Sequence, residues 1–553
     1  MTERALHQPE QLALLFIDED GSRQAITAAR LYQGAWDYAA ALQVAGVTPN
    51  ELVILVLPHS MQLVDAFWGA LLLGAIPAIY PYLTPKLDVG VYQQRVRAAV
   101  TQSQAGAVVT YPEFKAPLQA LLQGASCRVL AWDELSTGQN TAPGALPVPP
   151  GDGDRLAILL HTSGSSGVPK GVPFSHRQVL DHAQALGQAV AIQTDDVIVS
   201  WLPLHHDMGM IAGLLMPLVH GVPVVLMSPF YWIRSPIMLL RAVHEYQGTL
   251  TWMPNFAYNY ITRSVRQRDL DGLDLSSWRM LINAAEPVRY DSHQIFLQRF
   301  APLGLRPSAL GSAYGMTEEG GVTVSPPGVV APVDWVELRS LQEERCAVPV
   351  EPAAPGSTPI VSCGVPMPGV QIRIVDEQGS DLPERRVGEV VIHSSFLFRG
   401  YYRRPDLTNK VLRGGWYATA DMGYLAGGHL YLCGRKTDMI IASGKNLYPQ
   451  DLEAIADGVP GVYPGRTVAL GVINESLGTE EIVLVCELRQ PLPPAEKFEV
   501  ERLLRRRVVQ EIDIAPAEVH LLDETGWVLK TPAGKVARAA NKEKYLSNLR
   551  RYE

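Results

Sequence analysis

Short apolar runs alternate with longer stretches of helical periodicity through most of the chain before residue 363. The runs that resemble buried strands are LVILVL at Leu52, GAVVTY at Gly106, LAILL at Leu156, PVVLM at Pro223 and RMLINAA at Arg279. Uninterrupted apolar runs are typical of strands buried on both faces, as in parallel sheets covered by helices. The pattern predicts an α/β fold, with a large N-terminal domain of parallel-rich sheets and helices over residues 1–434.

The pattern changes twice toward the C-terminus. From about residue 363 to 434, short alternating runs are separated by tight turns, as in VQIRIVDEQGSDLPERRVGEVVIHS. Such spacing is typical of hairpins, so we expect a small barrel-like β subdomain here. After Gly434 the segments become shorter and more charged, which predicts a separate small α+β domain over residues 435–553.

The stretch from Met208 to Ile233 contains no charged residue and is long enough to span a bilayer. Prolines and glycines interrupt it, so we expect a buried helix followed by a buried strand instead. The N-terminal sequence MTERALHQPEQ lacks the basic segment and apolar core of a signal peptide. We therefore expect no transmembrane segment.

The composition narrows the class of protein. The chain has 553 residues, 47% of them hydrophobic, and a net charge of −9 with a pI near 5.9. An acidic chain of this kind argues against a nucleic-acid-binding protein, which would show a basic surface. Its five cysteines are scattered and form no C-x-x-C pair, so neither a disulfide framework nor a zinc site is predicted. These features fit a cytoplasmic protein.

A glycine- and serine-rich loop follows the apolar run at Leu156, in the sequence HTSGSSGVPKGV. Backbone N–H groups, hydroxyls and one ammonium can together cradle phosphate oxygens. The ATPase P-loop pattern does not fit, because Pro169 stands where its second glycine belongs and Lys170 is followed by Gly171. The serine-hydrolase elbow also fails, and a flexible linker stays open as an alternative.

Four further motifs follow this loop in order: SAYGMTEEGG at Ser312, GWYATAD at Gly415, GRKTDMIIASGKNLYPQDLE at Gly434 and TPAGK at Thr531. Together with the loop they resemble the adenylate-forming superfamily of acyl-CoA synthetases, luciferases and peptide-synthetase adenylation domains. The resemblance spans nearly the whole chain. It implies ATP and Mg²⁺ as cofactors and the transfer of AMP to a carboxylate, with release of pyrophosphate.

The resemblance also implies roles for individual residues. The phosphate loop supplies Thr162, Ser163, Gly164, Ser165, Ser166, Gly167 and the catalytic Lys170. Further ATP or AMP contacts are implied for Glu286, Ser312, Ala313, Tyr314, Gly315, Met316, Thr317, Asp421 and Arg435. Asp421 and Arg435 match the residues that hold the ribose hydroxyls, and Glu318 and Thr162 are the implied Mg²⁺ ligands. A carboxylate suits the ribose because it accepts two hydrogen bonds at once.

Lys535 in TPAGK matches the catalytic lysine that reaches from the small domain to the substrate carboxylate and the α-phosphate. Two negatively charged groups must meet in this reaction, and an ammonium that bridges them lowers their repulsion. The resemblance further implies that the small domain is mobile and turns about a hinge at Lys436–Asp438. Thr437 stands where an acidic residue or a lysine is usual, which leaves its part in this movement open.

Within the superfamily, the stretch WLPLHHDMGMIAGLLMPLVHGVPVVLMSP is similar to the fatty acyl-AMP ligases. The acyl-binding residues implied are His206, Asp207, Met208 and Gly209. The apolar residues that follow suit the wall of an acyl tunnel, although a plain core helix would have the same composition.

An insertion at about residues 329–360 also matches these ligases. In them it hinders the use of CoA, so that the acyl group of a fatty acid passes to the phosphopantetheine thiol of an acyl carrier protein acting in trans. An ordinary surface loop is the alternative. A fatty acyl-CoA synthetase and a non-catalytic adenylate-binding protein remain as other functions, and the acyl chain length and the identity of the carrier stay open.

Overall fold

The computed structural model of the chain describes residues 1–83, 89–135, 152–162, 170–442, 445–474, 479–512, 514–531 and 534–548. A nine-stranded sheet with the order β17-β14-β13-β12-β11-β9-β10-β1-β2 forms the centre of the large domain. Its strands are β1 (Leu12–Ile17), β2 (Arg23–Thr27), β9 (Ile198–Ser200), β10 (Val224–Met227), β11 (Leu250–Met253), β12 (Met280–Asn283), β13 (Leu310–Met316), β14 (Gly320–Val324) and β17 (Val365–Pro366). The strands from β13 to β1 run parallel, as the apolar runs predict.

A second, fully parallel sheet has the order β4-β3-β5-β6. It consists of β3 (Leu52–Val56), β4 (Ile76–Ile79), β5 (Ala107–Thr110) and β6 (Arg128–Ala131). Beside β4 lies an antiparallel pair, β7 (Leu156–His161) and β8 (Gly171–Ser175). The two strands that flank the glycine-rich loop in the sequence thus pair with each other, and next to this pair the Thr162 N–H donates to the Lys170 carbonyl at 3.0 Å.

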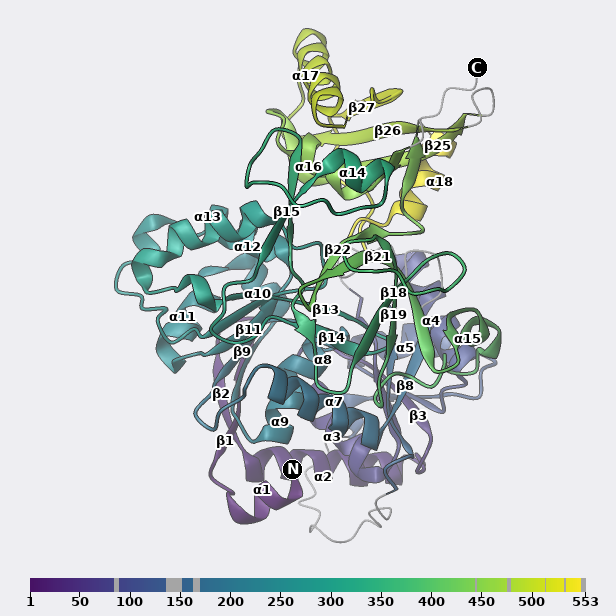
Figure 1. Cartoon of the computed structure of the whole chain (residues 1–553). Coiled ribbons are helices and arrows are strands. Elements are labelled where there is room, and N and C mark those ends of the chain that lie inside the picture. The colour runs from purple at the N-terminus through teal and green to yellow at the C-terminus, as the bar shows by residue number, and fades with distance from the viewer. Residues whose placement is uncertain are drawn as a thin grey trace.

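Helices cover these sheets (Figure 1). They are α1 (Thr2–His7), α2 (Ala28–Val44), α3 (Met61–Leu73), α4 (Val89–Ser103), α5 (Pro112–Leu121), α6 (Trp132–Leu135), α7 (His176–Ala189), α8 (Asp207–Met210), α9 (Met216–His220), α10 (Pro229–Arg234), α11 (Ile237–Tyr246), α12 (Asn255–Ser264) and α13 (Tyr290–Phe300), with 3₁₀ turns η2 (Gln267–Asp269), η3 (Ala301–Leu303) and η4 (Pro307–Ala309). Local chemistry sets their ends. For example, α7 begins at a capping box in which Ser175 Oγ accepts the Gln178 N–H and the Gln178 side chain accepts the Ser175 N–H.

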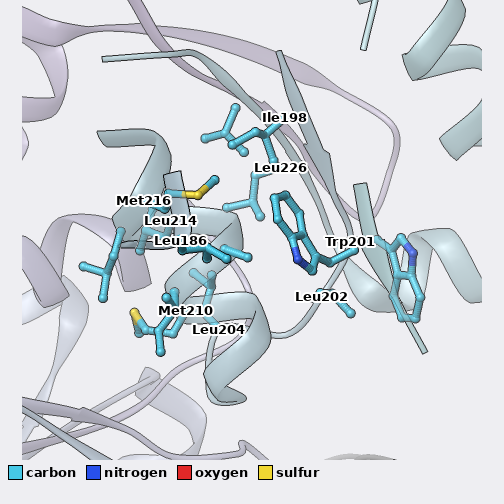
Figure 2. Packing of buried hydrophobic residues seen from close by; sticks show 14 of the residues in the cluster. Leu186, Ile198, Trp201, Leu202, Leu204, Met210, Leu214, Met216 and Leu226 are labelled. Atoms are coloured by element: carbon cyan, nitrogen blue, oxygen red, sulfur yellow. The ribbon is translucent and has the colours of Figure 1, made fainter. Parts of the chain in front are cut away.

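The uncharged stretch forms a buried helix and strand, as predicted. Between α8 and α9 the helix widens into the π-turn η1 (Ile211–Leu215), and β10 follows. Figure 2 shows Met210 and Leu214 of this stretch packed in one apolar cluster with Trp201 and Leu202. Burying these large side chains contributes about 1.5–3 kcal/mol each and fixes the helix in place. In the described part of the chain, no helix is both long and apolar enough to cross a membrane.

The region after residue 363 forms an antiparallel sheet of β18 (Gln371–Val375), β19 (Gly388–His393), β20 (Leu412–Arg413), β21 (Trp416–Ala426) and β22 (His429–Arg435), joined by helix α15 (Pro405–Val411). This is the β-rich subdomain of hairpins that the sequence predicts, and its sheet is open: no pairing between described residues joins β18 to β20 or β22. The sheet stays open because neighbouring layers cover it: Val390 and Ile392 join the large core, whereas Tyr424 and Tyr431 join a separate apolar cluster.

Residues of the predicted insertion form an antiparallel pair, β15 (Val333–Glu337) and β16 (Ser357–Val361), with helix α14 (Leu338–Glu343) between them. Figure 1 shows α14 beside α16 (Pro449–Asp457), at the boundary with the C-terminal elements. Val336 and Leu341 are buried together with Met422 and Tyr448, so this segment packs as part of the fold.

The C-terminal part forms an α+β unit, as predicted. A hairpin of β23 (Ile440–Ala442) and β24 (Lys445–Leu447) precedes a sheet of β25 (Val462–Asn474), β26 (Thr479–Leu488) and β27 (Glu518–Leu522), which packs with α16, α17 (Pro494–Ile512) and α18 (Arg538–Asn548). The five cysteines are free, in agreement with the absence of a disulfide pattern. The fold is therefore α/β, with a large N-terminal domain and a small C-terminal domain.

Candidate active site

A cavity of about 2970 Å³ lies between the large and the small domain. It brings together residues that are hundreds of positions apart in the sequence. The predicted site residues that line it are Thr162, Lys170, His206, Asp207, Met208, Glu286, Ala313, Tyr314, Gly315, Met316, Thr317, Glu318, Asp421, Arg435 and Lys535. Their gathering at one cavity is the geometric basis for a single active site.

Two predicted residues lie in the packed interior instead. The Ser312 hydroxyl is fully buried and is engaged with Ser325 and with the Ser362 carbonyl, so it ties β13 to its neighbours. At Gly209 an added Cβ would stand 2.4 Å from the Pro203 carbonyl oxygen, so that position needs glycine for close packing. The loop residues Ser163, Gly164, Ser165, Ser166 and Gly167 lie outside the described residues.

Asp421 and Arg435 form an ion pair on neighbouring strands at one side of the cavity. Arg435 Nε donates to Asp421 Oδ1 at 2.9 Å, and the Tyr314 hydroxyl donates to Asp421 Oδ2 at 2.6 Å. The neighbouring Asp421 carboxylate raises the pKa of Arg435 above its ordinary value, so the guanidinium stays charged. Because both partners hold the Asp421 carboxylate rigidly, it is ready to accept the hydroxyls of a diol such as ribose.

Ala420, just before this aspartate, has a left-handed φ of 60°. Its N–H donates to Glu389 Oε1 at 3.2 Å and its carbonyl accepts from the Lys436 N–H at 2.8 Å, so bonds on both sides hold the conformation. A left-handed conformation costs an alanine about 1–2 kcal/mol, which glycine avoids.

Ala420→Gly should therefore raise the free energy of unfolding by up to about 1 kcal/mol, after the larger chain entropy of glycine is subtracted. Ala284 is the matched control, since it also lines the cavity but is not among the left-handed residues of the described chain. There the change to glycine should lower the free energy of unfolding by about 0.5–1 kcal/mol. Denaturant melts that give both variants the same sign would contradict this account.

Glu318 and Lys170 both contact Tyr401, a residue that lies outside the motifs. The Tyr401 hydroxyl donates to Glu318 Oε1 at 2.6 Å, and Lys170 Nζ lies 3.4 Å from the same hydroxyl and 4.6 Å from the ring centroid. Burial and the Glu318 carboxylate raise the pKa of Tyr401, so the phenol stays protonated and donates. Tyr401 thus orients both charged groups toward the cavity.

The donor chemistry here suits a magnesium ion. Mg²⁺ prefers hard oxygen ligands, and it usually takes one or two carboxylates, substrate phosphates and water rather than a full protein cage. Glu318 and Thr162 offer a carboxylate and a hydroxyl to the cavity, and the Thr162 hydroxyl also accepts the Lys170 N–H at 3.2 Å. Within the described ranges there is no cluster of three His, Cys, Asp or Glu side chains that could hold a metal ion.

Asp207 begins the short helix α8 next to His206. Burial alone would raise the pKa of Asp207, but the His206 imidazole 2.6 Å away and the Met208 N–H keep that pKa well below its usual range. The Thr317 hydroxyl donates to its other oxygen at 3.1 Å. Asp207 is therefore a fixed negative charge that joins the His206–Gly209 stretch to the 312–318 motif.

Glu286 follows Ala285, whose left-handed φ of 68° turns the chain toward the cavity. The Phe256 N–H donates to Glu286 Oε2 at 2.9 Å, while burial raises the pKa of the carboxyl.

Lys535 enters the same cavity from the small domain. Burial lowers the pKa of its ammonium, and the surrounding Asp207 and Glu286 carboxylates counteract part of that change. The backbone at Lys535 is fixed by Thr531, whose N–H donates to the Lys535 carbonyl at 2.7 Å. A cation of this kind, held between two domains, can bridge two anionic reactants.

An apolar arm of the cavity extends beyond Asp207. Its lining includes Leu202, Met208, Ile211, Ala212 and Phe256. Beside it the Trp201 and Trp232 indoles stack with centroids 3.6 Å apart. Ile211 and Ala212 belong to the π-turn η1, and such widened turns often occur at functional sites. It can hold a hydrocarbon chain next to the polar groups described above.

Sequence reasoning missed Tyr401. Tyr401 lies in FLFRGYYRRP, which carries no spacing that indicates a site. Only its place in the cavity wall, next to Glu318, reveals it.

Comparison with known proteins gives one family. The model of the AMP-binding enzyme family matches residues 1–402. Among similar proteins, the long-chain-fatty-acid–AMP ligase FadD26 of Mycobacterium marinum is 31% identical over 582 residues, covering 99% of this chain and 97% of that protein. The medium-chain-fatty-acid–acyl-carrier-protein ligase JamA of Moorena producens is 30% identical over 521 residues, covering 90% and 86%.

Solved structures agree with this relation. A chain from a study of fatty acyl-adenylate ligases of E. coli and L. pneumophila superposes with a TM-score of 0.89 at 27% identity, covering 97% of this chain and 96% of that one. Both domains are therefore shared with these proteins.

Proposed function

Because the chain belongs to the family of AMP-binding enzymes, we propose that it activates a medium- or long-chain fatty acid with ATP, forming an acyl-adenylate and pyrophosphate. The acyl group then passes to the phosphopantetheine thiol of an acyl carrier protein, a separate protein that acts in trans. One observation carries the proposal: Lys535, Asp421, Arg435 and Glu318 meet at a cavity whose apolar arm begins at Asp207.

The chemistry of the first step follows from these placements. A carboxylate at the mouth of the apolar arm attacks the α-phosphorus of ATP, and pyrophosphate leaves. Lys535 bridges the attacking carboxylate and the phosphate, and Asp421 holds the ribose so that the reacting atoms stay aligned. Glu318 and Thr162 would hold Mg²⁺, which would supply charge neutralisation at the phosphates.

The choice of acceptor rests on the insertion at residues 329–360. Arg345 Nη2 donates to Asn446 Oδ1 at 3.3 Å, and Asn446 Nδ2 donates to the Gln342 carbonyl at 2.9 Å. Leu338 packs against the apolar core of the small domain. These contacts join the insertion to the small domain, and they support a restraint on the arrangement that CoA would need.

The test supplies dodecanoate, ATP and Mg²⁺ with either CoA or a holo acyl carrier protein, and identifies the thioester formed. The proposal predicts acyl-adenylate in both reactions and a thioester mainly on the carrier protein. Rapid acyl-CoA formation by the intact protein would identify it as an acyl-CoA synthetase instead.

A double variant tests the restraint without removing buried residues. Arg345→Ala with Asn446→Ala removes the two hydrogen bonds between the insertion and the small domain but leaves Val336 and Leu341 packed. Each such bond contributes about 0.5–1.5 kcal/mol, so acyl-CoA formation should rise on the order of tenfold while adenylation stays within about twofold. The control is Glu344→Ala, which changes an exposed residue of the same segment directly after α14. Unchanged acyl-CoA formation in the double variant would mean that these contacts do not restrain the small domain.

A further inference from the structure

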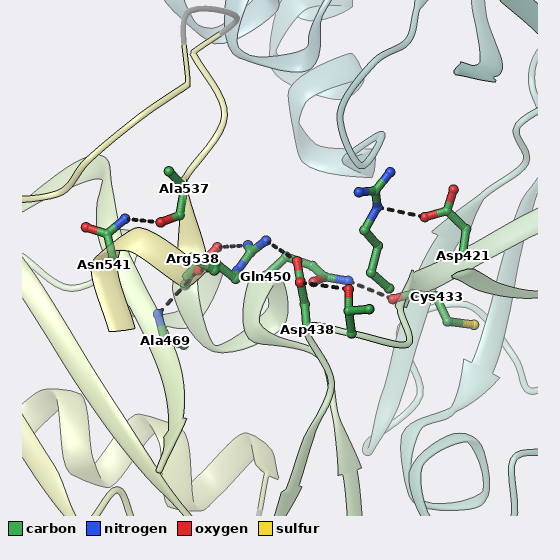
Figure 3. A network of polar contacts seen from close by, with 11 residues as sticks. Asp421, Cys433, Asp438, Gln450, Ala469, Ala537, Arg538 and Asn541 are labelled. Atoms are coloured by element: carbon green, nitrogen blue, oxygen red, sulfur yellow. Dashed lines mark hydrogen bonds and ion pairs between the residues drawn. The ribbon is translucent and has the colours of Figure 1, made fainter. Parts of the chain in front are cut away.

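Arg538 lies three residues after Lys535 and joins two acidic side chains. Its Nη1 donates to Asp438 Oδ2 at 3.1 Å, while Nη2 and Nε donate to Glu453 Oε2 and Oε1 at 2.6 and 3.1 Å. Figure 3 shows the Arg538 guanidinium turned toward Asp438. Arg538 binds Glu453 through two nitrogen atoms, which fixes the plane of the guanidinium. Its orientation toward Asp438 is therefore fixed as well.

Asp438 lies in the segment that leads from the large domain to the small domain, which we call the crossing segment. This segment connects β22, the last strand of the antiparallel sheet, to β23 of the small domain. The Asp438 N–H donates to the Arg435 carbonyl at 3.2 Å, and Arg435 is itself paired with Asp421. Thr437 adds a further contact, since its hydroxyl donates to Asp438 Oδ1 at 3.2 Å. Asp438 is therefore tied to the predicted ribose site through Arg435.

Glu453 anchors the other side of the guanidinium in the body of the small domain. It lies on α16, and its Oε1 also accepts the Ala469 N–H of β25 at 3.3 Å. Only 13% of the Glu453 side chain is exposed, so the two carboxylate oxygens have little water to replace these partners. Arg538 thus links the small-domain core to the crossing segment.

The backbone between Lys535 and Arg538 is held by hydrogen bonds, so the position of Arg538 also determines the position of Lys535. The Ala537 N–H donates to the Leu529 carbonyl at 2.9 Å. The buried Asn541 side chain bonds both the N–H and the carbonyl of Leu529, and it also donates to the Ala537 carbonyl. Since the loop is held on both sides of Lys535, a shift of Arg538 would shift the lysine as well.

We infer that Asp438, Arg538 and Glu453 form a latch within the small domain that holds Lys535 at the reacting centre for adenylation. The inference rests on the proposed function, because it assigns the latch to the first of its two steps. All three residues belong to the small domain over residues 435–553, so the latch acts inside this domain. Arg538 and Asp438 are positioning residues, which act through Lys535 and not on the substrate.

The experiment measures the two steps separately in Asp438→Asn, Arg538→Gln and the wild type. Pyrophosphate release with dodecanoate reports adenylation, and acyl transfer from purified dodecanoyl-adenylate to holo acyl carrier protein reports the second step. The latch predicts a 10- to 100-fold lower kcat for adenylation, a KM for ATP within about twofold of the wild type, and transfer at least as fast as in the wild type.

Arg538→Gln could unfold the small domain, because it removes the contact with Glu453 as well. Asp438→Asn keeps the Arg538–Glu453 contact, so it tests the contact between Arg538 and Asp438 alone. Arg502→Gln on α17 is the matched control, because it breaks an exposed ion pair with Glu499 in the same domain. Equal losses in both steps, or no loss in a folded Asp438→Asn protein, would overturn the inference. If the wild type releases no pyrophosphate with any fatty acid, the proposed function itself is wrong. If the wild type is active and the variants have the same rates, only the latch is wrong.

Discussion

Replacing Lys535 by alanine should lower the rate of acyl-adenylate formation on the order of a hundredfold or more, because the cation that offsets two meeting anions is lost. The residue enters the cavity from the small domain, whereas the Asp421 and Glu318 carboxylates belong to the large domain. ATP binding should therefore survive. Pyrophosphate release with dodecanoate gives the rate, and calorimetry gives the affinity for ATP.

Lys497→Ala is the control for this variant, since Lys497 pairs with Asp523 on the surface of the same domain. It should adenylate at the wild-type rate. Adenylation by Lys535→Ala within tenfold of the wild type would refute the bridging role, and a parallel loss of ATP affinity would indicate that the lysine serves binding instead.

Replacing Glu318 by glutamine should lower adenylation on the order of ten- to a hundredfold and raise the Mg²⁺ concentration needed for half-maximal rate, because the ligand loses its charge. Glutamine still offers an oxygen to the Tyr401 hydroxyl, so the side chain should keep its place. A titration of the rate with Mg²⁺ separates the loss of metal affinity from a loss of structure.

Glu318→Asp is the matched variant, which retains the charge but shortens the side chain by one methylene group. Its Mg²⁺ requirement should fall between those of the wild type and Glu318→Gln. If the glutamine variant needs no more Mg²⁺ than the wild type, Glu318 is not a ligand of the metal.

Much of the fold follows from local features of the sequence. The apolar runs at Leu52, Gly106, Leu156, Pro223 and Arg279 all become strands, because an uninterrupted run of branched apolar residues is stable only when it is buried on both faces. The two-domain α/β organisation and the family were also predicted. The motifs identify the family because the backbone turn and the charged side chain of each motif lie within a few residues of each other in the sequence.

The sequence could not predict the contacts between distant segments. Tyr401 bonds to Glu318 from 83 positions away, and Arg538 reaches Asp438 across 100 positions. Neither pair has a spacing that marks it. Nor does the sequence tell whether the β-rich sheet closes on itself, since closure depends on which layers cover the sheet. Ser312 lies in a motif of the site, yet its hydroxyl is used within the interior, a distinction that only packing reveals.

The most direct measurement supplies the purified protein with dodecanoate, ATP and Mg²⁺ and follows pyrophosphate release together with the mass spectrum of the product. The account predicts pyrophosphate and dodecanoyl-adenylate in equal amounts, both absent when either dodecanoate or ATP is omitted. No pyrophosphate release with any saturated fatty acid from octanoate to stearate, or release that requires an amino acid instead, would contradict it.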